Sequence, residues 1–373
     1  MRLTTIRLGV MLPAVLAVAC SPKAGERAET GRVDTTGAVS DAAEVPSAPA
    51  KPSDEMQAVL ISLASLHPKP IAELSAVEAR KQPSPANAVT ALLKQRGQST
   101  APEPVGSVGN RTIKGPGGAI PVRIYTPKGE GPFPVVVYYH GGGWVIADLD
   151  TYDASPRAIA NLANAVVVSS HYRQGPEHKF PAAHQDAFAA YKWTLANAKS
   201  IKGDPARVAV MGESAGGGLA GAVSLMARDS GVQLPVHQVL VYPIAGYDLN
   251  TPSYQENADA KPLNKPMMAW FFKQYLSSPA DGRNPLIDLV HADLKGLPSA
   301  TVINAQIDPL RSEGEQLAKA LEAAGVESEQ KTYSGVTHEF FGMGKVVDVA
   351  KDAEQMAADG LKHGFARPAT AAR

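Results

Sequence analysis

Ser214 is the first residue whose setting in the sequence predicts chemistry. It is the centre of Gly212-Glu213-Ser214-Ala215-Gly216, which matches the pattern G-x-S-x-G and follows an apolar run at 208–211. In this pattern a serine lies on a tight turn between a strand and a helix, where its hydroxyl is exposed and can attack a carbonyl carbon. The flanking glycines are needed because side chains would crowd the turn. A glycine-rich helix start without chemistry is the alternative interpretation.

A serine nucleophile needs a base and an acid that orients the base, and both are expected to follow it in the order serine, acid, histidine. Asp308 comes just after the apolar run 300–305, and His338 follows a strand-like run at 330–333. Both therefore fall at strand ends, where a parallel sheet presents its working side chains. The other histidines lack this placement, and we expect them to be surface or hydrogen-bonded residues: those at positions 67, 171, 178, 184, 237, 291 and 363.

A second glycine-rich run supplies candidate donors for the negative charge that such an attack creates. The residues His140, Gly141, Gly142 and Gly143 follow the apolar run 134–139. Consecutive glycines let the backbone approach a ligand and point N–H groups at it, and one well-placed donor stabilises the transition state by roughly 3 kcal/mol. A plain flexible loop is the alternative, whereas a phosphate cradle is disfavoured because no G-K-[ST] follows.

The elements that must position these residues follow an α/β pattern. Continuous apolar runs are typical of strands covered on both faces, and here they alternate with helical stretches. The predicted strands lie at 121–125, 134–139, 165–168, 208–211, 239–242, 300–305 and 330–333. The predicted helices lie at 56–63, 72–79, 88–94, 155–164, 180–197, 217–228 and 314–324. This order predicts a mainly parallel central sheet flanked by helices on both faces.

The composition argues against several other classes of protein. The 373 residues include 36 Lys+Arg and 36 Asp+Glu, and this balance argues against nucleic acid as a partner. Hydrophobic residues at 44% suit a large core and are too few for a polytopic membrane protein. The single cysteine excludes an intrachain disulfide, a thiolate zinc site and an iron–sulfur cluster. His338-Glu339 begins like the zinc-protease motif H-E-x-x-H but reaches Gly342, so we expect no metal and no other cofactor.

The first 19 residues have the features of a signal peptide. Two arginines precede an apolar stretch at 8–19 that is too short to span a bilayer. Residues 17–19 (Ala-Val-Ala) fit ordinary signal peptidase, whereas residues 16–20 resemble a bacterial lipobox in which Cys20 is acylated. We favour the lipobox because the only cysteine falls at the cleavage point, although Ala17 stands where leucine is usual. The protein is then exported to the periplasm or cell surface and anchored to a membrane through Cys20.

Together the motifs resemble those of the hormone-sensitive-lipase-like group of α/β-hydrolases, the bacterial family IV esterases. The resemblance covers roughly residues 55–365, and its separations, 94 residues from Ser214 to Asp308 and 30 more to His338, are typical of the family. It rests on residues 140–143, 212–217, 308–311, His338, 172–173, 176–178 and 180–183. It implies the α/β-hydrolase fold with an N-terminal helical cap.

The resemblance also implies a function, that of a serine carboxylesterase acting on small acyl esters through a covalent acyl-enzyme. Ser214 attacks the ester, His338 carries its proton to the leaving alcohol, and Asp308 orients the imidazole. The implied oxyanion hole is made by the backbone N–H groups of Gly142, Gly143 and Ala215, and the motifs are supported by His140, Gly141 and Glu213.

The predicted domain organisation follows from the composition and the resemblance. A signal peptide at 1–19 is followed by a polar, disordered tether at 20–55, a helical cap segment at 56–100 and a catalytic domain at 101–373. A cap insertion is expected near 247–276, and its large side chains either line the acyl pocket or form the core of the cap: Tyr254, Met267, Met268, Trp270, Phe271 and Phe272. The resemblance also implies pairing of two copies into a homodimer.

Four departures from the family pattern bear on the site. Glu213 replaces the usual Asp or Thr, Gln174-Gly175 replaces Leu-Ala, and Ser312 replaces an acidic residue. Glu339 follows His338 where a small residue is usual, and we expect its carboxylate to be solvated rather than to select substrates by charge. Amide or lactone hydrolysis by the same triad is the main alternative function. A non-catalytic ligand-binding relative is disfavoured because His338 is present.

Overall fold

The computed structural model describes residues 50–367. The predicted signal peptide at 1–19, Cys20 and most of the predicted tether lie outside the described residues. Helix α1 (Asp54–Ser65) begins where the composition turns apolar, and the Ser53 side chain caps it by accepting a hydrogen bond from Met56 N. Within the described part of the chain, no helix is long and apolar enough to cross a membrane.

One eight-stranded sheet forms the centre of the fold, in the order β1-β2-β4-β3-β5-β6-β7-β8. Strand β2 pairs antiparallel with both of its neighbours, β1 and β4, and all the other neighbours pair parallel, so the predicted mainly parallel sheet is confirmed. The strands are β1 (Ser107–Gly115), β2 (Gly118–Thr126), β3 (Phe133–Tyr139), β4 (Val166–Ser170), β5 (Gly203–Glu213), β6 (Gln238–Val241), β7 (Ala300–Ile307) and β8 (Ser328–Thr337).

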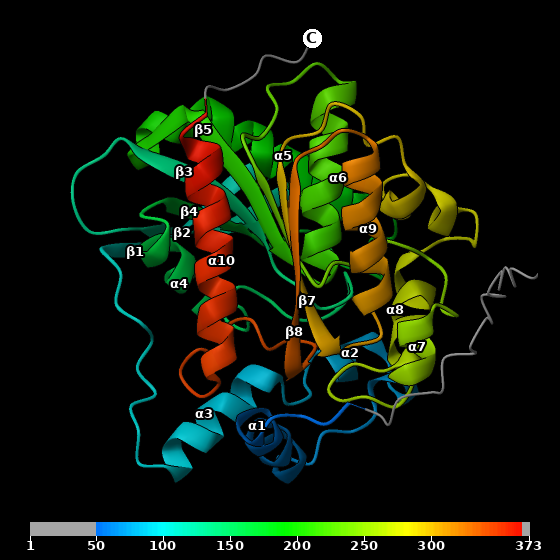
Figure 1. The fold of residues 1–373 in the computed structure, drawn as a ribbon. Helices are drawn as coiled ribbons and strands as arrows, with labels where there is room; N and C mark the ends of the chain where they lie inside the picture. The colour runs from blue at the N-terminus through cyan, green and yellow to red at the C-terminus, as the bar shows by residue number, and fades with distance from the viewer. Residues whose placement is uncertain (1–49, 368–373) are drawn as a thin grey trace, which may run out of the picture. The chain divides into compact units, whose positions relative to one another are not determined.

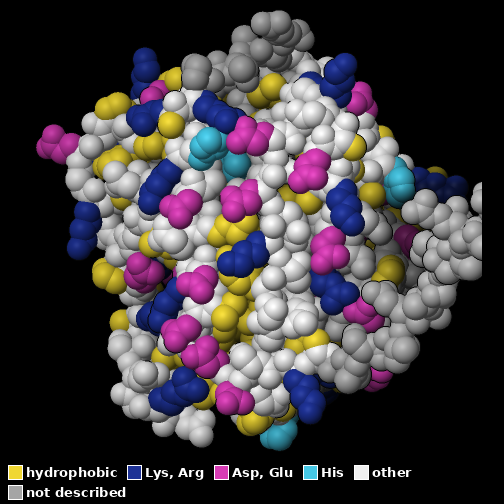
Figure 2. Space-filling model, in the orientation of Figure 1, with side chains coloured by type: hydrophobic (Ala, Val, Ile, Leu, Met, Phe, Trp, Pro, Cys, Tyr) yellow, Lys and Arg dark blue, Asp and Glu magenta, His cyan; other side chains and the backbone are white. Residues whose placement is uncertain are grey.

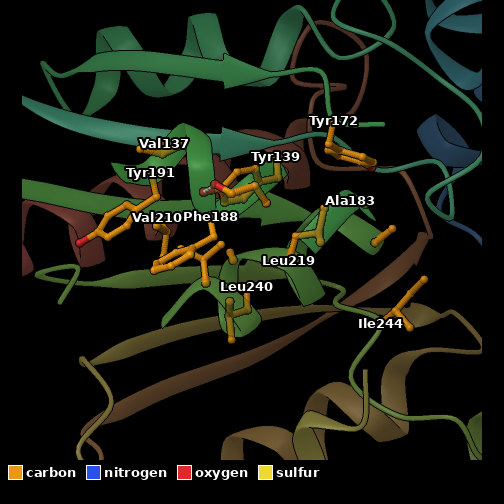
Figure 3. Packing of buried hydrophobic residues seen from close by; sticks show 14 of the residues in the cluster. Val137, Tyr139, Tyr172, Ala183, Phe188, Tyr191, Val210, Leu219, Leu240 and Ile244 are labelled. Carbon is orange, nitrogen blue, oxygen red and sulfur yellow. Dashed lines mark hydrogen bonds between the residues drawn. The ribbon is translucent and has the colours of Figure 1, made fainter. Parts of the chain in front are cut away.

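Helices cover both faces of this sheet (Figure 1). One face packs against α4 (Ala154–Leu162) and α10 (Asp348–Phe365), and the other against α5 (Ala182–Asn197), α6 (Ala215–Asp229) and α9 (Arg311–Ala323). The two faces follow from the strand period of two, because Val135 and Val137 of β3 belong to one apolar cluster and Val136 to the other. Figure 3 shows the first cluster, where Val137 and Val210 lie near Phe188 and Leu219.

Two helical segments build a cap over the carboxyl ends of the strands. The N-terminal cap segment contains α1, the 3-10 turn η1 (Ile71–Glu73), α2 (Ala76–Ala79) and α3 (Pro85–Gln95). The predicted insertion contains α7 (Pro252–Glu256) and α8 (Lys265–Tyr275), and α8 packs against η1. Three more 3-10 turns complete the described elements: η2 (Ala198–Ile201), η3 (Asp281–Arg283) and η4 (Leu289–His291).

The structure corrects the prediction in three places. The helix expected at 72–79 is split into η1 and the four-residue α2, because Ser75 caps α2 through reciprocal hydrogen bonds with Glu78. Strand β1 was not predicted, since Ile113 is its only buried residue and the alternation that marks a strand is missing. The final helix α10 was not predicted either, although its alanines and Leu361 pack on the sheet.

Charged side chains of both signs are interspersed over the face that carries α10 (Figure 2). A phosphate-binding surface requires a cluster of lysine and arginine, and no part of this face is dominated by these residues. The view therefore agrees with the balance of charge in the composition.

Candidate active site

Ser214 lies on the turn that joins β5 to α6. Its backbone is strained, with φ of 57° and ψ of −121°, a conformation that residues with a side chain rarely adopt. A Cβ atom at Gly212 would collide with the carbonyl of Gly216, and one at Gly216 would collide with the carbonyl of Tyr139. Close backbone contacts across the turn therefore explain why glycine is required on both sides of the serine.

The structure brings Ser214, His338 and Asp308 into one hydrogen-bonded row. His338 Nε2 lies 2.9 Å from Ser214 Oγ, and His338 Nδ1 lies 2.7 Å from Asp308 Oδ2. The other Asp308 oxygen accepts a hydrogen bond from Leu310 N at 2.9 Å, which fixes the carboxylate. Burial by itself lowers the pKa of His338, but the charge and hydrogen bond of Asp308 outweigh it, and the pKa is raised.

The glycine loop, residues 141–147, borders the same cavity as Ser214. Gly142 and Gly143 have φ of 95° and 58° and line the cavity together with Ser214 and His338. Within residues 50–367, neither their backbone N–H groups nor that of Ala215 donates a hydrogen bond to the protein. Ala215 is fully buried at the start of α6 and does not line the cavity itself.

His140 and Gly141 support the site from behind. His140 is buried, its two ring nitrogens lie 2.8 Å from Gly141 O and 3.1 Å from His171 Nδ1, and burial followed by the neighbouring His171 lowers its pKa to about 3. A Cβ atom at Gly141 would collide with the Tyr152 hydroxyl and lie 3.1 Å from Ser214 Cβ. His140 is thus a neutral structural residue, and Gly141 is required by the close approach of Tyr152 and Ser214.

Glu213, the last residue of β5 and the neighbour of Ser214, is buried. It accepts hydrogen bonds from the Tyr138 hydroxyl at 2.5 Å and from the Tyr242 hydroxyl. Burial raises its pKa to about 7, against the lowering effect of these hydrogen bonds. Strand β3 and the residue directly after β6 are thereby bound to the residue that precedes Ser214, so Glu213 has a structural role.

Glu339 is only partly exposed, so the expectation of a solvated carboxylate holds only in part. Its side chain is 21% exposed, and its Oε1 accepts a hydrogen bond from the Tyr152 hydroxyl at 2.5 Å and lies 4.0 Å from His338 Nε2. Burial raises the pKa of Glu339, and the nearby charge of His338 acts in the opposite direction. Tyr152, which was missed in the sequence, belongs to no motif and is 187 residues away from Glu339.

A cavity of about 400 Å³ opens over Ser214 and His338. Most of its lining is apolar and comes from the N-terminal cap segment, the glycine loop and the insertion. Met267 and Phe271 line it, whereas the other four candidates from the insertion do not. Trp270 instead donates to Leu74 O at 3.0 Å, and Tyr254, Met268 and Phe272 are buried in the core. Within the described residues, no group of three or more His, Cys, Asp or Glu could hold a metal ion.

The fold and this site define an α/β-hydrolase. Residues 136–342 match the family model described as alpha/beta hydrolase fold, so the chain belongs to that family. It is 41% identical to the carboxylesterase NlhH of Mycobacterium tuberculosis, over 63% of this chain and 75% of that protein. It is 31% identical to the ethyl acetate hydrolase of Pseudomonas putida, over 79% of this chain and 92% of that protein.

Solved structures agree with these relatives. A hyperthermophilic esterase from the archaeon Pyrobaculum calidifontis superposes with a TM-score of 0.76 and 37% identity, over 84% of this chain and 98% of that one. Esterases recur among both kinds of relative. The protein is therefore a serine hydrolase of carboxylic esters.

Proposed function

We propose that the protein is a serine carboxylesterase that cleaves small acyl esters through a Ser214-His338-Asp308 triad and a covalent acyl-enzyme. The observation that carries this proposal is the row of hydrogen bonds from Ser214 through His338 to Asp308, placed at the floor of a largely apolar cavity. A nucleophile, its base and the group that orients the base are thus all within hydrogen-bond reach.

Acylation follows from these positions. His338 Nε2 takes the proton of Ser214 Oγ as this oxygen attacks the ester carbonyl carbon, and Asp308 holds the Nδ1–H and stabilises the imidazolium. The negative oxygen of the tetrahedral intermediate accepts hydrogen bonds from the backbone N–H groups of Gly142, Gly143 and Ala215. The proton on Nε2 then passes to the leaving alcohol oxygen, and the C–O bond of the ester breaks.

Deacylation repeats the same steps with water. His338 takes a proton from a water molecule, the resulting oxygen attacks the acyl carbon, and Ser214 Oγ leaves with the proton returned by the imidazolium. The carboxylic acid is released and the free serine is restored. No step calls for a metal or another cofactor.

The cavity supports small and largely uncharged acyl groups as the substrate class. Its volume of about 400 Å³ is at the small end of ligand sites, and most of its wall is apolar. Its charged lining residues are Glu339 beside His338 and four residues from exposed parts of the cap: Lys69, Glu73, Arg80 and Lys261. Small uncharged esters therefore fit the floor of the site better than long or strongly charged ones.

The direct test is turnover of a series of p-nitrophenyl esters from acetate to dodecanoate. We expect the shorter esters to be hydrolysed fastest, and Ser214→Ala to lower kcat by at least about 1,000-fold, because removing the nucleophile leaves only binding and the oxyanion donors. Unchanged turnover by Ser214→Ala would contradict the proposed role of this residue. Faster cleavage of the matching p-nitroanilide or lactone would favour the amide or lactone alternative.

We also propose that the protein is exported and tethered to a membrane by acylation of Cys20. The spacer is the predicted tether at 20–55 without its last two residues, which belong to α1. The support is the single cysteine directly after an apolar leader of signal-peptide length. Pairing into a homodimer stays a prediction, and sedimentation of the purified protein would test it.

A further inference from the structure

The glycine loop has a strained backbone beyond its two glycines. Trp144 and Ala147 also have positive φ, 60° and 66°, and both carry a Cβ atom that makes this conformation unfavourable. Such strain persists only where the surrounding structure holds the backbone in place. The loop therefore needs external contacts to keep Gly142 and Gly143 in place at the cavity wall.

Part of this support comes from the segment after β4. Gly175 N donates to Trp144 O at 2.9 Å, and Gln174 Nε2 donates to Ile146 O at 2.8 Å and to Ala147 O at 2.9 Å. These two residues are the ones that replace the family's usual Leu-Ala. The departure thus places an amide where it binds two carbonyl groups of the strained loop.

The remaining carbonyl of this stretch, that of Val145, is bound by a residue of the cap. Arg80 directly follows α2, and its Nε donates to Val145 O at 2.8 Å. The same guanidinium donates to Gly175 O at 2.7 Å and forms a two-bond ion pair with Glu177 at 2.8 and 2.6 Å. The Arg80 guanidinium in turn lowers the pKa of Glu177 to about 2.

The geometry of these bonds suits arginine and no other side chain. A planar guanidinium presents several N–H groups in fixed directions and can serve a carboxylate and two carbonyl groups at once, whereas a lysine ammonium cannot keep this arrangement. The bonds join three segments that are far apart in the sequence: the cap at residue 80, the glycine loop and the segment 174–177.

We propose that Arg80 is a positioning residue for the oxyanion hole, which couples docking of the cap to the shape of the glycine loop. The donors of Gly142 and Gly143 are aligned for the transition state only while α2 is seated and Arg80 holds Val145 O. This inference rests on the proposed esterase function and adds a role for the cap beyond covering the cavity. Arg80 acts through the backbone of the loop and not on the ester itself.

The test compares Arg80→Met and Arg80→Lys with the unaltered full chain on p-nitrophenyl butyrate. A misaligned hole is expected to lower kcat by about 10- to 100-fold for Arg80→Met, with KM within about threefold, because the lost contact acts in the transition state. The affinity for butylboronic acid, whose tetrahedral serine adduct uses the same donors, is expected to fall in parallel with kcat/KM.

Arg157→Met is the matched control. The Arg157 side chain is 14% exposed, against 29% for Arg80, and it too joins two segments. It donates to Asp153 at 2.6 Å and to Glu103 O at 3.0 Å, but it does not touch the glycine loop. Its loss is expected to leave kcat within about twofold, because an effect on folding alone does not alter the folded site.

Three results would overturn the proposal. An unchanged kcat in folded Arg80→Met would show that the loop holds its shape unaided. A rise in KM alone would make Arg80 a substrate contact, and equal losses in Arg80→Met and Arg157→Met would make the effect one of general stability. If Arg80→Met does not fold, Arg80→Lys, which retains the charge, is judged by the same changes in kcat and KM. An unaltered chain that hydrolyses no ester would contradict the proposed function itself, and this inference with it.

Discussion

The imidazole of His338 faces two carboxylates. Asp308 binds Nδ1, and Glu339 lies 4.0 Å from Nε2, the nitrogen that is 2.9 Å from Ser214 Oγ. Their charges raise the pKa of His338 against the lowering effect of burial, and buried Glu213 adds to the rise. The hydroxyl of Tyr152 fixes Glu339, so this second charge is held in place rather than free in solvent. The pKa of this proposed base is therefore raised by carboxylates near both of its ring nitrogens.

The effect of Glu339 can be measured in the pH dependence of kcat/KM. His338 must be neutral to accept a proton, so kcat/KM falls as the pH drops through its pKa. Glu339→Gln removes a negative charge next to Nε2, and we expect the pKa of His338 to fall and the acid limb of the profile to move to lower pH. Asp308, Glu213 and the ring of Tyr242, 4.4 Å from His338, remain in place.

Glu73→Gln is the control for this shift. Glu73 also lines the cavity but is exposed and belongs to η1 of the cap, so the acid limb should stay where it is. An acid limb that is unchanged in Glu339→Gln, or that moves to higher pH, would show that Glu339 does not act on His338.

At the scale of elements, α10 carries a buried carboxyl that makes stability depend on pH. Glu354 is 7% exposed, and burial, with smaller effects from Glu103 and Glu213, raises its pKa to about 8. Between its ordinary pKa near 4.5 and this value, the folded chain holds a proton that the unfolded chain releases. Stability is therefore expected to fall as the pH rises through this window.

Glu354→Gln tests this expectation by urea unfolding at pH 5 and pH 9. Both folded chains are uncharged at this position near pH 5, so their free energies of unfolding should differ little there. At pH 9 the variant should be more stable by about 2–4 kcal/mol, because it has no buried charge. The exposed Glu322 of α9 provides the control, Glu322→Gln, and equal effects of Glu354→Gln at both pH values would contradict the account.

Elements whose signal is local were predictable, and contacts between distant segments were not. The strands that end at Glu213, Ile307 and Thr337 were predicted because buried parallel strands have continuous apolar runs, and the residues directly after them form the proposed triad. Strand β1 lacked this signal because most of it is exposed. The side of α8 that meets the cavity is decided by packing against η1, so periodicity could not separate Phe271 from Trp270.

Because contacts between distant segments could not be predicted, the partial burial of Glu339 was not foreseen. Its position after His338 is visible in the sequence, but its hydrogen bond comes from Tyr152, a loop residue 187 positions earlier. The bonds of Arg80 likewise cross 65 and 97 residues of sequence. Motifs locate the reacting groups, whereas the residues that tune and align them emerge only from the fold.

At the scale of the whole molecule, the tether proposal makes a prediction about location. In a bacterial host, the unaltered chain should be found with membranes, and Cys20→Ser should release it, because the acyl chains supply the binding energy. Ser21→Ala, next to the same site, should leave the protein membrane-bound. Fractionation followed by an esterase assay measures both, and an unaltered chain that is not found with membranes would refute the anchor.

The central claim, that Ser214 is a nucleophile activated by His338, is tested most directly by covalent labelling. A fluorophosphonate reacts with an activated serine, and mass spectrometry of the digested protein locates the adduct. We expect a single phosphonyl group on the peptide that contains Ser214, no labelling of Ser214→Ala, and labelling slowed by at least about 100-fold in His338→Gln, which lacks the base. An adduct on another residue, or labelling of Ser214→Ala at the rate of the unaltered chain, would contradict the account.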